Sequence, residues 1–178
     1  MNTEQQKIEY KSLQKIRTGE KGFKELSTTC VALANAQGGQ IMIGVEDKTK
    51  KPGPNQIIPQ EEANSAVTRL RGLCFNVGLA VGDVCADETG SQYFAITVFP
   101  SLHSYATTSD GKMYIRVADK CEPVRSEDIQ RVGEEKGAFQ WELVPTQFEL
   151  EDENKTNLSK FANDIRQSDR VKLHIKQL

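Results

Sequence analysis

The chain has 178 residues, a formal net charge of −2 and two histidines. This length allows one ordinary domain and an appendage, since single domains usually have about 100–150 residues. The charge excludes a protein covered with Lys and Arg for indiscriminate DNA binding, although local basic patches remain open. No apolar run reaches the roughly 18 residues of a membrane span, and the N-terminus lacks signal-peptide segments, so we expect a cytoplasmic protein with no membrane partner.

The four cysteines are spread along the chain without a Cys-x-x-Cys pair and without a histidine at ligand spacing. They are Cys30, Cys74, Cys85 and Cys121. Such spacing signals neither a zinc site nor a disulfide framework. The sequence therefore predicts reduced, mostly structural thiols.

Residues 20–36 repeat apolar side chains at helical spacing, which predicts an amphipathic helix. Asn35, Gly38 and Gly39 follow at its end, and we interpret them as a structural turn that stops the helix rather than as a phosphate site. Residues 40–45 then alternate Ile and Val with other side chains, a period of two that is typical of a core strand.

A second helix is predicted over residues 60–77, with Gly78 as its C-terminal stop. Three strand-like runs follow, with turn signals between them, and a meander is the simplest connection. They cover residues 79–85, 93–99 and 112–117. Ser126 and the two acids after it predict the start of a short helix, and residues 139–144 have the pattern of one more strand.

After residue 146 the composition of the chain becomes acidic. This acidic stretch precedes a predicted helix with Leu158, Phe161 and Ile165 on one face. We therefore divide the chain into a domain over residues 1–145 and an acidic linker with an amphipathic helix over residues 146–178. The second part is expected to lead into a domain absent from this chain. The predicted fold is α/β (α+β), a mixed sheet packed with two main helices.

Three acidic residues are candidates for a site: Glu4, Glu9 and Asp47. Carboxylates that converge can hold a hard divalent cation, which lowers the pKa of an attacking water, and Lys11 could stabilise charge on a phosphate. A regular strand would place residues 4 and 9 on opposite faces, so convergence requires a bend or bulge. The alternative is structural: Glu9 pairs with Lys11, Asp47 caps a loop and Glu4 faces water.

These residues belong to a longer pattern. It comprises Glu4-x4-Glu9-Tyr10-Lys11, an amphipathic helix, Ala32-Leu33-Ala34-Asn35-Ala36-Gln37-Gly38-Gly39, Ile43-Gly44-Val45-Glu46-Asp47 and the later Tyr114-Ile115-Arg116-Val117. Over residues 1–135 the pattern resembles the Schlafen AlbA_2 domain family, also called divergent AAA-4, in its bacterial form. The family is described as DNA-binding or regulatory in bacteria, and the resemblance implies a nucleic-acid-binding module of a transcriptional regulator or a related bacterial protein.

In the animal Schlafen branch, two glutamates and an aspartate form the site of a metal-dependent endoribonuclease. The resemblance assigns these roles to Glu4, Glu9 and Asp47, with Mg²⁺ or Mn²⁺ as cofactor; otherwise no cofactor is expected. The Schlafen zinc cluster of His and Cys has no counterpart here. The chain also holds one lobe where the Schlafen core pairs two, so a homodimer is a candidate partner.

Binding of DNA or RNA is the leading hypothesis, and it assigns phosphate contacts to five basic residues near Glu9 and Asp47. They are Lys11, Lys15, Lys48, Lys51 and Arg116. The endoribonuclease is the first alternative, and a protein-interaction or dimerisation module, suggested by the amphipathic tail, is the second. ATP binding is least favoured because the chain has neither a Gly-x4-Gly-Lys-Ser/Thr loop nor a Gly-x-Gly-x-x-Gly fingerprint.

Overall fold

A computed structural model describes residues 7–135 and 155–167 of the chain. The chain divides into two compact units, Met1–Gln140 and Trp141–Leu178, which are described separately. The strands of the first unit are β1 (Ile8–Lys11), β2 (Gly39–Ile43), β3 (Cys74–Phe75), β4 (Gly78–Val81), β5 (Cys85–Ala86), β6 (Gln92–Phe99), β7 (Thr107–Thr108), β8 (Tyr114–Val117) and β9 (Lys120–Pro123). Its helices are α1 (Gln14–Arg17), α2 (Glu20–Asn35), α3 (Gln60–Leu73), the 3₁₀ turn η1 (Ser126–Asp128) and α4 (Ile129–Glu135).

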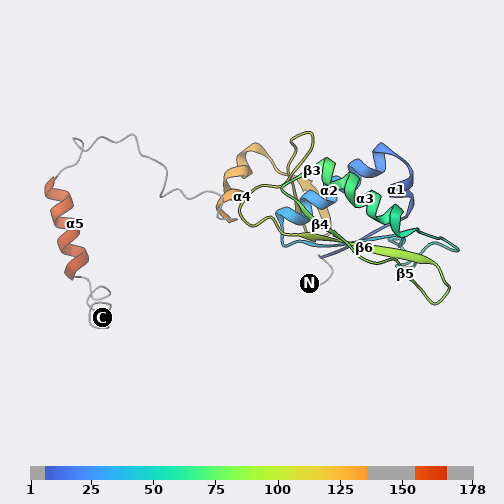
Figure 1. Ribbon diagram of the computed structural model, residues 1–178. Helices are drawn as coiled ribbons and strands as arrows, with labels where there is room; N and C mark the ends of the chain where they lie inside the picture. The colour runs from blue at the N-terminus through green and yellow to red at the C-terminus, as the bar shows by residue number, and fades with distance from the viewer. Residues whose placement is uncertain (1–6, 136–154, 168–178) are drawn as a thin grey trace. The chain divides into compact units, whose positions relative to one another are not determined.

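The main sheet has the order β1-β2-β6-β4, with β5 paired to the far part of β6. Strands β1 and β2 run parallel, whereas β2, β4 and β5 are antiparallel to β6. Helices α2 and α3 lie together on one side of this sheet (Figure 1). The predicted mixed α+β fold with two main helices is confirmed.

Alternation along the strands separates the two faces of the sheet. Ile41, Phe94 and Ile96 are fully buried and belong to the core that α2 and α3 cover. Their neighbours on the opposite face, such as Met42 and Tyr93, are only half-buried. The period of two therefore gives the sheet one apolar, helix-covered face and one accessible face.

Helix α2 ends where the sequence places its stop. The Gly38 amide donates to the carbonyl of Leu33 at 2.8 Å, and Gly38 has a φ of 73°, in the left-handed region that favours glycine. The Asn35 side chain does not face water but is buried: its Nδ2 donates to the carbonyls of Ala106 (2.8 Å) and Tyr114 (2.9 Å), and its Oδ1 accepts from the Ala106 amide (2.9 Å). Asn35 thus hydrogen-bonds the C-terminal end of α2 to Ala106, just before β7, and to Tyr114 of β8.

Several predicted boundaries are wrong. Helix α3 ends at Leu73, not at residue 77, because Cys74–Phe75 pairs with β7, and Gly78 begins a strand instead of stopping a helix. The run 79–85 divides into β4 and β5, and β8 pairs only with β9 among the described strands, so the meander is also wrong. The predicted strand over residues 139–144 lies outside the described residues.

The described part of the second unit is the helix α5 (Lys155–Gln167), which agrees with the predicted tail helix. Phe161 and Ile165 are exposed on it, at 64% and 43%. In the described ranges of both units, none of the helices has the length and apolar character that crossing a membrane would require.

Candidate functional site

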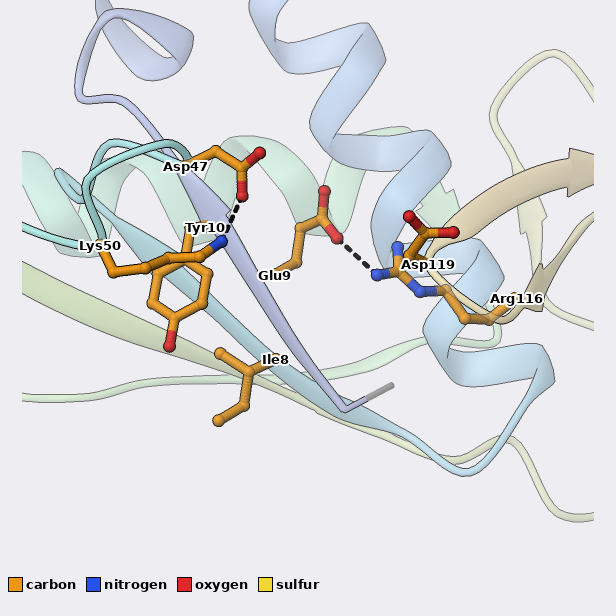
Figure 2. Close-up of a pocket in the computed structure, with 7 residues that line it drawn as sticks. All are labelled: Ile8, Glu9, Tyr10, Asp47, Lys50, Arg116 and Asp119. Carbon is orange, nitrogen blue, oxygen red and sulfur yellow. Dashed lines mark hydrogen bonds and ion pairs between the residues drawn. The ribbon is translucent and has the colours of Figure 1, made fainter. Parts of the chain in front are cut away.

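Glu9 and Asp47, two of the three predicted carboxylates, line one pocket of about 560 Å³. Strand β1 contributes Glu9, and the loop after β2 contributes Asp47 (Figure 2). The third carboxylate, Glu4, lies outside the described residues. The pocket has an edge strand, a loop and the β8–β9 turn as its walls, and its other lining residues are Ile8, Tyr10, Lys50, Arg116 and Asp119.

The Glu9 carboxylate lies between two cations. Its Oε1 is 2.8 Å from Lys11 Nζ and its Oε2 accepts a hydrogen bond of 2.6 Å from Arg116 Nη2. Such charge-assisted bonds to a half-buried carboxylate are stronger than bonds between neutral groups. The predicted local pair of Glu9 and Lys11 is therefore present, and Arg116 adds a contact across 107 positions of sequence.

Arg116 is buried beneath this pair, since its side chain is only 5% exposed. Burial is the largest influence on its pKa and lowers it, but hydrogen bonds with Cys121 and Glu9 outweigh burial, so the pKa of Arg116 is raised. Its Nη1 donates to Cys121 Sγ at 3.5 Å, whereas its Nε has no partner in the described part of the chain. Arg116 is thus a buried structural cation that binds the Glu9 carboxylate.

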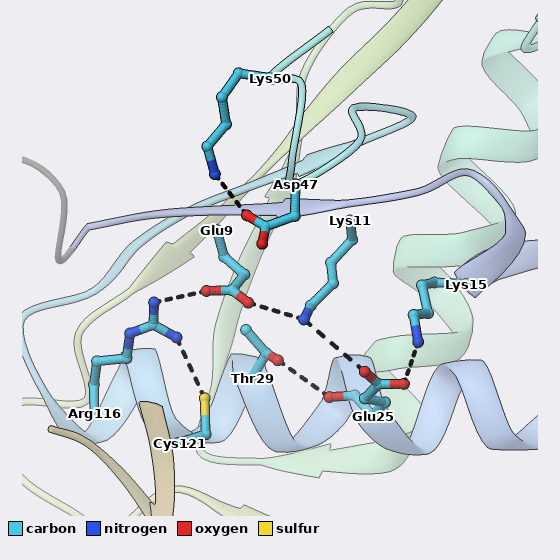
Figure 3. A network of polar contacts seen from close by, with 9 residues as sticks. All are labelled: Glu9, Lys11, Lys15, Glu25, Thr29, Asp47, Lys50, Arg116 and Cys121. Atoms are coloured by element: carbon cyan, nitrogen blue, oxygen red, sulfur yellow. Dashed lines mark hydrogen bonds and ion pairs between the residues drawn. The ribbon is translucent and has the colours of Figure 1, made fainter. Parts of the chain in front are cut away.

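Lys11 and Lys15 are also engaged. Both ammonium groups approach Glu25 of α2, at 4.0 Å and 2.5 Å (Figure 3). The hydrogen bond from Lys15 is the main reason why the pKa of Glu25 is lowered. Three of the five basic residues predicted to contact phosphate, Lys11, Lys15 and Arg116, therefore already neutralise carboxylates of the protein.

The other two lie in a tight loop that we call the lysine hairpin, residues 46–51. The Glu46 amide donates to the Lys51 carbonyl at 2.9 Å, and the Lys50 amide donates to the Glu46 carbonyl at 2.8 Å. Lys50 has a φ of 54°, a left-handed conformation that is uncommon for a residue other than glycine. These bonds fix the loop so that it projects charged side chains beside the pocket.

Within the lysine hairpin, Lys50 makes both an ion pair and a cation–π contact. Its Nζ lies 2.5 Å from Asp47 Oδ1, which lowers the pKa of Asp47, and it lies 4.2 Å from the ring centre of Tyr10. Lys48 and Lys51 are exposed, and no carboxylate of the described residues lies within 4.0 Å of either ammonium group. They are the two predicted contacts that the fold leaves accessible.

The described carboxylates do not fit a divalent cation as they stand. Glu9 is shared between Lys11 and Arg116, and Asp47 accepts from Lys50, so a metal would have to displace these cations. In residues 7–135 and 155–167, no three His, Cys, Asp or Glu side chains form a group that could hold a metal ion. A metal site at this pocket would therefore depend on Glu4.

Besides the apolar Ile8, sequence reasoning did not single out three residues of the pocket: Tyr10, Lys50 and Asp119. Tyr10 is part of the Glu9-Tyr10-Lys11 motif and Lys50 lies between the candidates Lys48 and Lys51, so a signal for both was present. Asp119 had none, because it reaches the pocket only through the turn between β8 and β9, where Ala118 has a φ of 55°.

Comparisons with known proteins agree with this architecture. Residues 4–125 match the family model described as Schlafen, AlbA_2. A solved structure, that of the DIP2311 protein from Corynebacterium diphtheriae, is similar with a TM-score of 0.50 and 21% identity over 69% of this chain. The matched part is only 26% of that protein, and at this identity the likeness concerns the fold alone. No curated protein matches the chain.

Proposed function

This chain belongs to the Schlafen AlbA_2 family, and we propose that it is a nucleic-acid-binding module, for DNA or RNA, of a regulatory protein. The observation that carries the proposal is the lysine hairpin. Its exposed Lys48 and Lys51 stand beside a pocket whose other cations are already paired with carboxylates. Accessible ammonium groups on a fixed loop bind phosphates by releasing counterions.

A salt series tests this proposal. We expect fluorescein-labelled DNA and RNA to bind the full chain at low ionic strength, with affinity falling as salt rises. The variant Lys48→Ala/Lys51→Ala should bind more weakly to every sequence, and the slope of log K against log salt should shrink by about 1.4–1.8, the value for two lost phosphate contacts.

The matched control is Lys24→Ala/Lys160→Ala, which removes the same charge from two exposed lysines outside the lysine hairpin. It should keep most of the slope of the original protein. Equal losses in both double variants would mean that total charge, not the hairpin, determines binding. Absence of any affinity at low salt would reject the proposed function.

A second candidate is hydrolysis of RNA, favoured by the position of Glu9 and Asp47 in one pocket. We propose Glu4, Glu9 and Asp47 as its carboxylates and Mg²⁺ or Mn²⁺ as its cofactor. The test is incubation of structured RNA with and without either ion, comparing the original chain with Asp47→Ala. Asp47 is exposed, so this change should leave the fold intact. Cleavage that Asp47→Ala does not reduce, or no cleavage at all, excludes this candidate.

A further inference from the structure

The accessible face of the main sheet carries a second pocket, of about 390 Å³, which shares Tyr10 and Lys50 with the first. Tyr10 and Met42 are partners in the register of β1 and β2, and Met42 is the partner of Ala95 on β6, two positions after Tyr93. Alternation places these side chains on one face, opposite to Glu9. Figure 2 shows Tyr10 and Ile8 directed away from the Glu9 carboxylate.

Two tyrosines and a methionine are among the residues that line this pocket. Tyr10, Met42 and Tyr93 are all half-buried, so each of these side chains keeps an accessible surface. A volume of about 390 Å³ lies within the ordinary range of small-ligand pockets, about 300–1,000 Å³. Tyrosine rings and a methionine thioether present flat or adaptable apolar surface, which suits a planar ring.

The rim of the pocket is charged with both signs. Lys50 and Lys51 of the lysine hairpin line it together with Asp87 and Glu88. Asp87 is engaged in its own turn, because its Oδ1 accepts from the Thr89 hydroxyl (2.7 Å) and from the amides of Thr89 (2.9 Å) and Ser91 (3.0 Å). Glu88 is exposed, and its carboxylate can accept hydrogen bonds from amino groups of a ligand.

We propose that this pocket binds a single unpaired nucleobase, with Tyr93 as its stacking platform. The inference rests on the proposed function and specifies it: the ligand is single-stranded, because paired bases are stacked inside a duplex and cannot enter. A phosphate beside the base reaches Lys51, which is exposed, and Glu88 favours bases with an exocyclic amino group. A rim with four charged residues fits this ligand better than an apolar peptide.

Tyr93 carries the contact because Lys50 already covers one face of the Tyr10 ring, at 4.2 Å. The test is fluorescence anisotropy of the full chain with single-stranded DNA, single-stranded RNA and the duplex of the same sequence. Tyr93→Ala should weaken single-stranded binding about 5- to 150-fold, the range for one lost stacked base, and change duplex binding less than about twofold. Tyr93→Phe keeps the ring and should bind as the original chain does.

Phe99→Ala is the matched control, because Phe99 is 51% exposed on the same face of β6 but does not line the pocket. It should leave single-stranded binding unchanged. Equal losses for Phe99→Ala and Tyr93→Ala would overturn the assignment to this pocket. If Lys48→Ala/Lys51→Ala weakens binding while Tyr93→Ala does not, the pocket is rejected and the proposed function stands. If the original chain binds no nucleic acid, both are rejected.

A measurement on the unaltered chain avoids any effect of substitution on folding. Cys85 does not line the pocket, but it is exposed and is the direct register partner of Tyr93, so a base stacked on Tyr93 should cover its thiol. We expect single-stranded DNA or RNA to slow alkylation of Cys85 by iodoacetamide several-fold, measured by mass spectrometry of the peptide, and the duplex to slow it much less. Equal protection by both nucleic acids, or none, contradicts the proposal.

Discussion

At position 35 one side-chain amide satisfies three backbone groups of other segments. The Asn35 amide bonds the N–H and C=O of Ala106 and the carbonyl of Tyr114, and its side chain is shielded from water. Buried backbone groups without partners cost about 1–3 kcal/mol each. The residue is therefore structural: it ties the end of α2 to β8, the strand that supplies Arg116 to the site.

We expect Asn35→Ala to lower the free energy of unfolding by about 2–4 kcal/mol, since it removes these bonds and leaves their backbone partners unsatisfied. Urea denaturation followed by circular dichroism measures the change. Asn64→Ala is the control, because Asn64 is exposed on α3 and its amide accepts only a weak bond of 3.3 Å from Gln60; its effect should stay within about 0.5 kcal/mol. Similar effects of the two changes would contradict the structural role of Asn35.

At the scale of elements, the α2 turn depends on the absence of a side chain at Gly38. A Cβ there would lie 2.6 Å from the Val98 carbonyl oxygen and 2.9 Å from Pro100 Cδ, and the φ of 73° is itself unfavourable for other residues. Gly19, before α2, has a similar φ of 79° but open space around its Cα. Comparing substitutions at Gly19 and Gly38 therefore separates the free-energy cost of the positive φ from the cost of steric contacts made by an added methyl group.

Gly19→Ala should therefore destabilise the protein by about 1–3 kcal/mol, the cost of a backbone conformation (φ 79°, ψ −143°) that residues other than glycine rarely adopt. Gly38→Ala should cost more, about 2–4 kcal/mol, because the added methyl group also displaces β6 or the Pro100 segment. Thermal and urea unfolding of both variants measure the difference. Equal destabilisation would show that the turn has room for a side chain and that only its φ matters.

The helices and central strands were predictable because their residues repeat with the period of the element. α2 and β2 follow their apolar patterns closely, and so does β6. The end of α3 was not predictable, since Cys74 and Phe75 leave the helix only to pair with β7, more than 30 positions away in sequence. Local pattern contains no information about such distant partners.

The same limit applies to the site. The sequence indicated that Glu9 and Asp47 could meet, and they do line one pocket. It could not show that Arg116 would be buried against Glu9, or that Lys11 and Lys15 would pair with Glu25. These ion pairs determine which basic residues are accessible to phosphate, and they depend on packing between β1, α2 and β8.

At the scale of the whole molecule, the exposed apolar side chains of α5 predict self-association. Phe161 and Ile165 occupy one stripe of this helix, at the spacing of four residues that suits a helix partner. We expect light scattering on the full chain to show a concentration-dependent dimer, and Phe161→Glu/Ile165→Glu to shift it to monomer. Lys160→Glu, an exposed position on the same helix, is the control. A monomer at all concentrations would mean that this helix is not an assembly device.

The bond between Arg116 and Glu9 has a consequence for how the chain folds. It joins β1 to a hairpin 107 positions later, and so distant a contact pays its loop-closure entropy before it adds any stability. The contact is therefore expected to form after the rate-limiting step. Its removal should accelerate unfolding and leave the refolding rate nearly unchanged, so the guanidinium under Glu9 sets the lifetime of the native state rather than the speed of reaching it.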